Sequence, residues 1–401
     1  MAGKNWKNYL NKVSGSNRFL ALGMLAVACA VFFVFGIYPH LTSVRALLSA
    51  PAEEKQFPFV ESVIAEPPKP KHVETPTAVR AIYMTSWVAG TPKWRAELVD
   101  FIKNSEINSL IIDVKDYTGM VAFDTQSEKI KAEGSEEIRV KDMREFIEEL
   151  HDADIYAIAR ITVFQDPHYA KKHLNIAVQK KNGTLWKDRK GLSYLDPGAK
   201  EYWDYIIEIA RASEAAGFDE LNFDYIRFPS DGNMSDIAFP VSGTRAKDKP
   251  AVLDEFFAYL DQSLSDLPTP ISADVFGMVT TNTDDLNIGQ LLEPIAKHFD
   301  YVAPMIYPSH YPAAFHGYKN PAAHPYEIVK IAMESGVARL QAPTSTPTKL
   351  RPWIQDFDLG ADYGVAEIKA QKQAIYDSGL TSWMSWDAAN KYTRGAYNLD
   401  P

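Results

Sequence analysis

Cysteine is almost absent from this sequence of 401 residues, in which Cys29 is the single example. One cysteine excludes intramolecular disulfides and sites where several thiolates bind a metal ion. Histidine is also scarce, and the nine histidines include no HExxH pattern of the kind that binds catalytic zinc. We therefore predict no metal site.

Glycine-rich loops that hold phosphate groups are missing as well. No GxGxxG pattern follows a predicted strand and opens a helix, which argues against a nucleotide cofactor. The last two predicted strands lack the glycine-rich phosphate loop of many barrel enzymes, which argues against a phosphorylated substrate. We expect the protein to use no cofactor.

Basic residues are outnumbered by acidic ones, 42 Lys and Arg against 52 Asp and Glu, so the formal net charge is -10. A nucleic-acid-binding protein needs a basic face for the phosphates, and this balance argues against one. The charge is uneven along the chain: residues 1–50 carry five basic residues and no acid, which leaves -15 for the remainder. The two parts of the chain are therefore suited to different environments.

Residues 19–38 form a long run without any charged side chain. As a helix with a rise of about 1.5 Å per residue, this run would span the roughly 30 Å hydrocarbon core of a bilayer. Four basic residues precede it, so the positive-inside rule predicts that residues 1–18 are a cytoplasmic tail. We expect an uncleaved signal-anchor that contacts the lipid bilayer through residues 19–38 and places the rest of the chain on the extracytoplasmic side.

A cleaved signal peptide is the alternative for this segment. Its apolar region is usually about 7–15 residues, shorter than the run found here, and a small-x-small cleavage site should follow it. Ala46 and Ala50 are candidate cleavage ends, but Val44 and Leu48 occupy the positions where a second small residue is expected. These features favour retention of the anchor.

Proline and charged residues dominate the segment that follows. Residues 39–77 include PAEEKQFPFVESVIAEPPKPKHVETPT, a composition that favours an extended, polyproline-like spacer over a packed core. We interpret residues 39–77 as a linker between the anchor and a domain at 78–401.

From residue 78 onward, strand-like apolar runs alternate with amphipathic helical stretches. Alternation of this kind predicts a parallel sheet covered by helices. Eight such units over roughly 320 residues match the size of a (β/α)8 TIM barrel, an α/β fold. The predicted strands are 79–87, 109–116, 154–164, 218–227, 270–277, 301–307, 349–357 and 379–386.

Two segments depart from the regular pattern. Residues 165–198 are long for a strand-to-helix connection, and KNGT within them predicts a small hairpin. Because this insertion follows a strand, it should lie at the C-terminal face of the barrel, where substrate sites of this fold are built. The chain after residue 386 is short, so the eighth helix should be short too.

Polar residues cluster at the predicted C-terminal ends of the strands. Alternate strand residues point into a barrel, and those near the C-terminal end line its mouth. Buried charges are unfavourable unless they are paired, so several at one end predict a site, although each could belong to a structural ion network such as Asp113–Lys115 or Asp224–Arg160. The inward-facing candidates are Asp113, Lys115, Arg160, Asn222, Asp224, Asp274, Tyr307, Trp353, Gln355 and Trp386.

The motif FDELNFDYIRFP on the fourth predicted strand is accompanied by SYLDPGAKEYWDYI, VAPMIYPSHY, LRPWIQDF and GLTSWMSWDAAN. Together these segments resemble the bacterial glycosyl hydrolase domain family known as domain of unknown function 4015, over about residues 78–398. The resemblance implies a glycoside-hydrolase-like TIM barrel with a polysaccharide or oligosaccharide substrate.

A more distant resemblance is to the chitinase-type barrels of glycoside hydrolase family eighteen. Their fourth strand carries D-G-x-D-x-D-x-E, and Asp219, Asn222 and Asp224 fall at similar places. Ile226 occupies the position of the acid glutamate, which argues against the substrate-assisted chemistry of chitinases.

Most glycosidases use two carboxyl groups, one as acid/base and one as nucleophile or base. Asp224 and Asp274 end neighbouring predicted strands about 4.8 Å apart, a spacing that favours a retaining over an inverting enzyme. The alpha-amylase type of barrel resembles this arrangement, with its nucleophile on strand four and its acid on strand five. We predict Asp224 as nucleophile and Asp274 as acid/base, with Asp113 and Asp356 as alternatives for the second role. Arg160 would favour the charged form of Asp224.

The other inward-facing candidates are predicted to bind the substrate, and the aromatic rings at strand ends could stack on the apolar faces of sugars. They are Asp113, Lys115, Arg160, Asn222, Tyr307, Trp353, Gln355 and Trp386.

The predicted function is that of a membrane-anchored glycoside hydrolase cleaving a polysaccharide of the cell envelope or the extracellular space. The alternative is a non-catalytic carbohydrate-binding barrel that acts in envelope assembly, which the absence of an acid at Ile226 would favour. The sequence predicts neither the sugar nor the oligomeric state.

Overall fold

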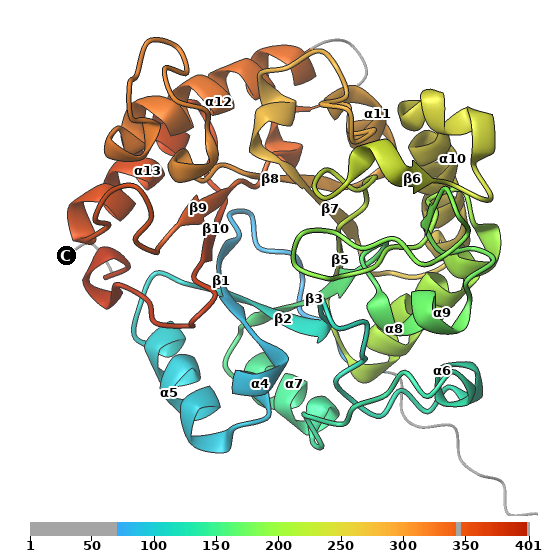
Figure 1. The fold of residues 1–401 in the computed structure, drawn as a ribbon. Helices are drawn as coiled ribbons and strands as arrows, with labels where there is room; N and C mark the ends of the chain where they lie inside the picture. The colour runs from blue at the N-terminus through green and yellow to red at the C-terminus, as the bar shows by residue number, and fades with distance from the viewer. Residues whose placement is uncertain (1–69, 342–345, 399–401) are drawn as a thin grey trace, which may run out of the picture. The chain divides into compact units, whose positions relative to one another are not determined.

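The computed structural model describes residues 70–341 and 346–398, which Figure 1 draws in colour. The chain divides after Pro67 into two units, and all described residues belong to the second. Within the described ranges, no helix has both the length and the apolar character that crossing a membrane requires. The predicted tail 1–18, the predicted anchor 19–38 and most of the predicted linker lie outside the described residues.

Eight parallel strands form a closed barrel (Figure 1). Each strand pairs with the next barrel strand along the chain, and β10 closes the ring on β1. All eight predicted strands are confirmed, and with them the (β/α)8 fold class. The barrel strands are β1 (Arg80–Met84), β2 (Ser109–Lys115), β3 (Tyr156–Thr162), β5 (Glu220–Asp224), β7 (Ile271–Phe276), β8 (Tyr301–Met305), β9 (Trp353–Gln355) and β10 (Trp383–Trp386).

Side chains of each strand alternate between two apolar environments. On β1, Ala81 and Tyr83 pack inside the barrel, while Ile82 and Met84 pack against the surrounding helices. Burial on both sides explains why the strands read as nearly continuous apolar runs. The interior cluster is the smaller of the two, because polar side chains occupy much of the barrel interior.

Helices cover the outside of the barrel (Figure 1). On α9, Tyr202, Ile206 and Ile209 recur at helical spacing on the buried face, and the helix ends at Gly217, whose φ of 112° glycine adopts without steric strain. The α-helices are α4 (Ser86–Ala89), α5 (Pro92–Lys103), α6 (Glu128–Ala132), α7 (Met143–His151), α8 (Pro167–Lys172), α9 (Lys200–Ala216), α10 (Lys249–Leu264), α11 (Leu292–His298), α12 (Pro325–Leu340) and α13 (Val365–Asp377). Short 3-10 helices lie at Met234–Asp236, Gly243–Lys247, Gly277–Thr280, Pro308–His310, Pro321–Ala323 and Pro347–Lys349.

The two irregular segments follow the sequence prediction. In the insertion after β3, the amide of Gly183 donates to the carbonyl of Lys180, so KNGT turns a hairpin. Its strand β4 (Gln179–Lys180) pairs antiparallel with β6 (Ile237–Ala238). After β10 the eighth helix is reduced to the 3-10 helix η8 (Arg394–Ala396).

Residues 70–77 contact the N-terminal end of the barrel. The amide of Val73 donates to Oδ1 of Asp219 at 2.8 Å, and the hydroxyl oxygens of Thr75 and Tyr156 lie 3.1 Å apart. The last residues of the segment predicted as linker therefore pack on the barrel.

Candidate active site

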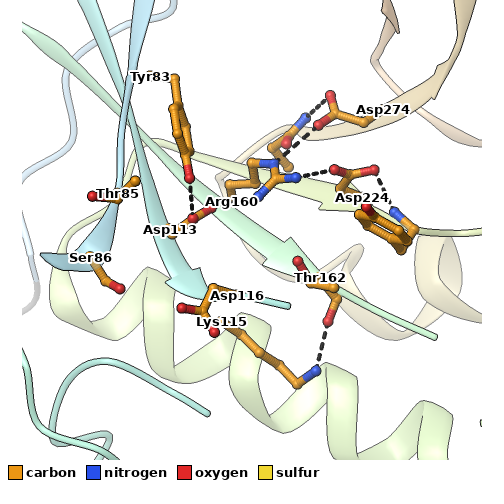
Figure 2. Close-up of polar contacts among 12 residues, drawn as sticks. Tyr83, Thr85, Ser86, Asp113, Lys115, Asp116, Arg160, Thr162, Asp224 and Asp274 are labelled. Carbon is orange, nitrogen blue, oxygen red and sulfur yellow. Dashed lines mark hydrogen bonds and ion pairs between the residues drawn. The ribbon is translucent and has the colours of Figure 1, made fainter. Parts of the chain in front are cut away.

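One arginine at the mouth of the barrel is surrounded by three carboxylates (Figure 2). Nη1 of Arg160 on β3 donates to Oδ1 of Asp113 at 2.6 Å, and Nη2 donates to Oδ2 of Asp224. Its Nε lies 3.5 Å from Oδ2 of Asp274. Burial acts to lower the pKa of Arg160, but the charges of Asp224 and Asp113 raise it well above its ordinary value. Three acids facing one base give the cluster a surplus of acidic groups.

The strand register brings these residues together. Arg160 lies beside Asp113 of β2 on one side and beside Asn222 of β5 on the other. Asn222 of β5 pairs in register with Ser272 of β7. Asp224 and Asp274 each follow two residues later on their strands, so they stand at the same level. Inward parity and register together therefore direct all of them to one point of the mouth.

Lys115 is a predicted site residue that the structure places elsewhere. The register of β2 shifts between Asp113 and Lys115, so that Lys115 pairs with the outward-facing Ile161. Its Nζ donates to the carbonyl of Thr162 at 2.8 Å and lies 2.9 Å from Asp166, away from the cluster around the arginine (Figure 2). The prediction that Lys115 shares a face with Asp113 is wrong, because counting alternate residues does not detect a bulge.

Opposing effects act on the carboxyl group of Asp274. Its Oδ1 accepts hydrogen bonds from Nε1 of Trp353 at 2.7 Å and from Nδ2 of Asn222 at 3.0 Å, and these bonds, like the charge of Arg160, favour the ionised form. Burial, and then the neighbouring charge of Asp224, outweigh them and raise the pKa of Asp274 to about 7. Near neutral pH this side chain is therefore a proton donor for part of the molecules.

Asp224 is held by a cation and by the backbone. Its Oδ2 accepts from Arg160, and its Oδ1 accepts from the amide of Tyr225 at 2.5 Å. Tyr225 has a φ of 53°, a left-handed conformation that is uncommon for a residue other than glycine. Backbone conformations of this kind concentrate at functional sites, and this one turns the chain out of β5 beside the carboxylate.

Aromatic rings form one wall of the cluster. Tyr83 of β1 donates to Asp113 and stacks on Trp386 with ring centroids 4.0 Å apart. The guanidinium of Arg160 lies 5.1 Å from the ring centroid of Trp386, and Trp353 meets that ring edge-on at 5.6 Å. Burial raises the pKa of Tyr83 well above its ordinary value, so the hydroxyl remains a donor. Tyr83 was not among the sequence candidates.

A cavity of about 450 Å³ opens at this cluster. Among the residues that line it, Asp224 and Asp274 are the two that carry carboxylates. The predicted site residues in the lining are Arg160, Asp224, Asp274, Tyr307, Trp353 and Trp386.

Three other predicted substrate-binding residues do not line the cavity but hydrogen-bond to the charged cluster or to the loop after β8. Asp113 and Asn222 hydrogen-bond to members of the charged cluster. Oε1 of Gln355 accepts from Oγ of Ser309 at 2.8 Å and so holds the loop after β8. These three side chains position the wall of the cavity.

Asp356, an alternative for the second catalytic carboxylate, is occupied outside the cavity. Its oxygens accept hydrogen bonds from the amide of Thr393 at 3.0 Å and from the hydroxyl of Tyr397 at 2.8 Å. Asp113, the other alternative, is enclosed by Tyr83 and Arg160. Neither residue belongs to the lining of the cavity.

Sequence reasoning missed several residues that line the cavity, because they lie on loops or follow a strand end where parity no longer applies. Tyr311 has a buried hydroxyl without a hydrogen-bond partner among the described residues. Burial, and then the charge of Lys190, lower the pKa of His310. The residues missed in this way are Lys190, Arg227, Met278, His310 and Tyr311.

Among residues 70–341 and 346–398, no group of three or more His, Cys, Asp or Glu side chains is arranged to hold a metal ion. The three acids at the mouth instead converge on Arg160.

Solved structures similar to this chain include known carbohydrate-active proteins. The glycoside hydrolase domain of PgaB (BpsB) from Bordetella bronchiseptica is 15% identical over 81% of this chain and 100% of its own, with a TM-score of 0.59. Alpha-L-fucosidase isoenzyme 2 from Paenibacillus thiaminolyticus is 11% identical over 80% of this chain and 47% of its own, with a TM-score of 0.54. A hypothetical protein from Ruminiclostridium thermocellum is 33% identical over 48% of this chain and 97% of its own, with a TM-score of 0.44. The first two likenesses show the barrel fold, and fold alone does not define an activity.

The family assignment rests on the sequence. A search of curated proteins finds no match. The model of the family described as "Putative glycosyl hydrolase domain" matches residues 81–392, a range that includes every residue lining the cavity. The resemblance noted in the FDYIRFP motif is thereby confirmed, and the chain belongs to the putative glycosyl hydrolase domain family, domain of unknown function 4015.

Proposed function

We propose that this chain is a membrane-anchored glycoside hydrolase that cleaves a cell-envelope or extracellular polysaccharide with retention of anomeric configuration. The observation that carries the proposal is a pair of unlike carboxyl groups in the cavity. Asp274 has its pKa raised to about 7, and Asp224 beside it is ion-paired with Arg160. Two carboxyl groups whose environments separate their protonation states can divide the roles of acid and nucleophile.

In the first step Asp224 attacks the anomeric carbon with a carboxylate oxygen while the bond to the leaving oxygen breaks. Asp274 donates its proton to that oxygen, so the leaving group departs as an alcohol. The sugar is then bound to Asp224 as an ester, and Asp274 is ionised.

In the second step Asp274 removes a proton from water, whose oxygen attacks the anomeric carbon and displaces Asp224 as a carboxylate. Arg160 would stabilise the negative charge that returns to Asp224. Two displacements restore the original configuration.

The strand register supports retention rather than inversion. Asp224 and Asp274 stand at the same level on adjacent strands, which lie about 4.8 Å apart. Both carboxylates also contact the same guanidinium, that of Arg160. This arrangement favours the carboxyl separation of about 5–5.5 Å found in retaining enzymes over the roughly 6.5–9.5 Å that an inverting enzyme needs.

The cavity offers suitable contacts for a sugar. Its volume falls in the range of small-molecule sites, about 300–1,000 Å³. Tyr307 and Trp386 present aromatic surface to it. The hydroxyl of Tyr311 is buried without a partner among the described residues, and a hydroxyl of a bound sugar would satisfy it.

Hydrolysis and its stereochemistry test this proposal. The full-length chain in detergent would be incubated with a panel of envelope and extracellular polysaccharides while new reducing ends are measured and proton NMR identifies the anomer formed first. We expect release of products with the anomeric configuration of the substrate. Inversion would contradict a nucleophilic Asp224, and glycan binding without hydrolysis by the wild-type chain would favour the carbohydrate-binding alternative.

Membrane anchoring is tested separately. It is supported by the basic tail and the uncharged run at 19–38. Protease added to intact cells should remove the barrel while the first eighteen residues stay protected. Release of the barrel into the medium with a new N-terminus near residue 51 would instead establish a cleaved signal peptide.

A further inference from the structure

Arg227 is a buried arginine that forms no ion pair with any described residue. It is 8% exposed, close to the 6% of Arg160 and the 3% of Arg351. Arg160 meets three carboxylates and Arg351 meets Glu220, whereas no described Asp or Glu forms an ion pair with Arg227. A buried charge without an opposite charge is strongly unfavourable. A cation in this position is expected to meet an anion that the barrel itself does not supply.

The guanidinium of Arg227 is fixed in place and lines the cavity of the carboxylate pair. Its Nη1 donates to the carbonyl of Phe228 at 3.0 Å and to Oγ of Ser230 at 3.2 Å. Its carbon centre lies 5.0 Å from the ring centroid of Tyr225 and 5.1 Å from that of Phe276. The other two guanidinium nitrogens have no hydrogen-bond partner among the described residues, so they remain available to a bound group.

A second cation reaches the same cavity from the insertion after β3. Lys190 is exposed, lines the cavity and forms no ion pair with a described residue. Oδ1 of Asp188 in the same loop accepts hydrogen bonds from the backbone amides of Lys190 and Leu192, at 2.9 and 2.8 Å, and Asp188 forms no ion pair with Lys190 or Arg227. The cavity therefore has a positive edge on a chain whose net charge is -10.

We propose that Arg227 and Lys190 form an anion-binding subsite beside the carboxylate pair, which takes a carboxylate or sulfate group of an acidic polysaccharide. This inference rests on the proposed function, because the subsite belongs to the same cavity. Arg227 and Asp224 line the same cavity, so the bound anionic group belongs to the sugar at the cleaved bond or to its neighbour.

The shape of the arginine suits such a group. A guanidinium directs several N–H donors in one plane and matches two oxygens of a carboxylate at once, and a sulfate presents a similar pair. The flanking rings of Tyr225 and Phe276 hold that plane in position before a ligand arrives. Lys190, on an exposed loop, would add a more flexible charge at the rim.

Binding to matched glycans, read by isothermal titration calorimetry, tests the subsite without requiring hydrolysis. The probes are oligogalacturonate against its methyl ester and a sulfated galactan oligosaccharide against its desulfated form, each pair having one sugar backbone. The full-length chain should bind an acidic member on the order of tenfold more tightly than its neutral counterpart. The two pairs distinguish a carboxylate ligand from a sulfate ligand.

Variants identify the source of the preference. Arg227→Met should abolish the preference for the acidic glycan, and Lys190→Met should reduce that preference about threefold. Lys190 is exposed on a loop, so its substitution should not affect folding. Lys187→Met, an exposed lysine of the same insertion outside the cavity lining, is the matched control and should leave the preference unchanged.

Equal binding of acidic and neutral members in both pairs, or no binding of any of them, would overturn the subsite. The subsite would also be overturned if the preference for acidic glycans persisted in the Arg227→Met variant and in the Lys190→Met variant. Because every readout is an affinity, an acidic preference without any hydrolysis would keep the subsite and contradict the proposed activity instead.

Discussion

The two ends of the barrel both bury charged side chains, but they balance those charges differently. At the N-terminal end, Glu220 pairs with Arg351 at 2.6 Å and accepts from the hydroxyl of Tyr156 at 3.1 Å, so one acid faces one base. At the C-terminal end, three acids face Arg160, and a cavity opens beside them. The same barrel interior therefore contains one balanced and one unbalanced cluster.

The difference indicates what each end does. A buried ion pair is tolerated when each charge meets its opposite and the remaining hydrogen bonds are made, which describes the N-terminal pair. At the mouth the surplus acid is accommodated by a raised pKa of Asp274. Groups with perturbed pKa values in a cavity are typical of functional sites, whereas balanced ion pairs are typical of a structural role.

The largest expected effect follows from Asp224→Asn at the mouth. The substitution preserves size and removes the charge of the proposed nucleophile, so turnover should fall on the order of 10³-fold or more. The melting temperature should hold or rise, because like-charge repulsion with Asp274 is relieved. Initial rates of reducing-end release and a thermal melt are the measurements.

Asp356→Asn is the matched control, since it removes a buried acid outside the cavity. Its turnover per folded molecule should equal that of the wild type. An Asp224→Asn variant that hydrolyses at the wild-type rate would exclude the nucleophilic role, and one that unfolds would make Asp224 half of a structural pair with Arg160.

Arg351→Met at the N-terminal end should show the opposite behaviour. It leaves Glu220 buried without its cation and should lower the free energy of unfolding by about 3–5 kcal/mol. Catalytic efficiency per folded molecule should not change, because the pair lies at the far end of the barrel. Urea unfolding together with kcat/KM measures both quantities, and Glu220→Gln combined with Arg351→Met should recover part of the stability. Loss of activity without loss of stability would break the proposed division.

The pH dependence should also separate the two ends. The proposed mechanism requires protonated Asp274, whose pKa is raised by burial and by Asp224 to about 7, so kcat/KM should fall about tenfold per pH unit above that value. Because the pKa of Asp274 in the folded state lies above the ordinary 3.8, the folded state binds more protons than the unfolded state between about pH 4 and pH 7. The contribution of Asp274 to stability therefore decreases as pH rises through this interval.

Two variants check the assignment of this titration. Asp274→Asn should remove the decline in stability between about pH 4 and 7, as followed by urea unfolding. Asp224→Asn should lower the pKa of Asp274, because it removes a neighbouring negative charge, as followed by carbon-13 NMR of the carboxyl group. In an Asp274→Glu variant the carboxyl pKa should shift, and the pH above which kcat/KM falls should shift with it. If the carboxyl pKa shifts and the fall in kcat/KM does not, another group causes that fall.

The smallest effect is expected from His72→Gln at the N-terminal end. The carboxylate of Asp219, 3.5 Å from Nδ1 of His72, raises the pKa of His72, burial opposes this rise, and Glu214, 3.1 Å from Nε2, adds to it. A histidine with a raised pKa contributes stability that is complete below about 6.5 and is lost as pH rises through the folded pKa. The substitution should therefore lower the free energy of unfolding by about 1 kcal/mol near pH 5.5 and by almost nothing near pH 8.5.

Thermal melts at the two pH values measure this difference. His316→Gln, an exposed histidine without an ion pair to a described residue, is the control and should behave alike at both. Equal destabilisation by His72→Gln at both pH values would show that the ring contributes by packing rather than by charge.

Most of the carboxylate cluster could be predicted from alternation along single strands. Asp113, Arg160, Asp224 and Asp274 face inward because two-residue periodicity persists up to the strand ends. The same counting failed for Lys115, where one extra residue in β2 reverses the direction of the side chain. Alternation is a local rule, and a bulge is visible only when the partner strand is known.

The sequence by itself determined the eight strand–helix units, because strands buried on both faces and helices buried on one leave different apolar periods in the chain. It also determined which strand residues face inward where no bulge intervenes. Only the tertiary structure decided which of the acids reach the cavity, that Asp113 is enclosed, and that Arg227 and Lys190 stand beside the pair without an acidic partner among the described residues. Those outcomes depend on loops and on contacts between residues far apart in the chain, which no local period records.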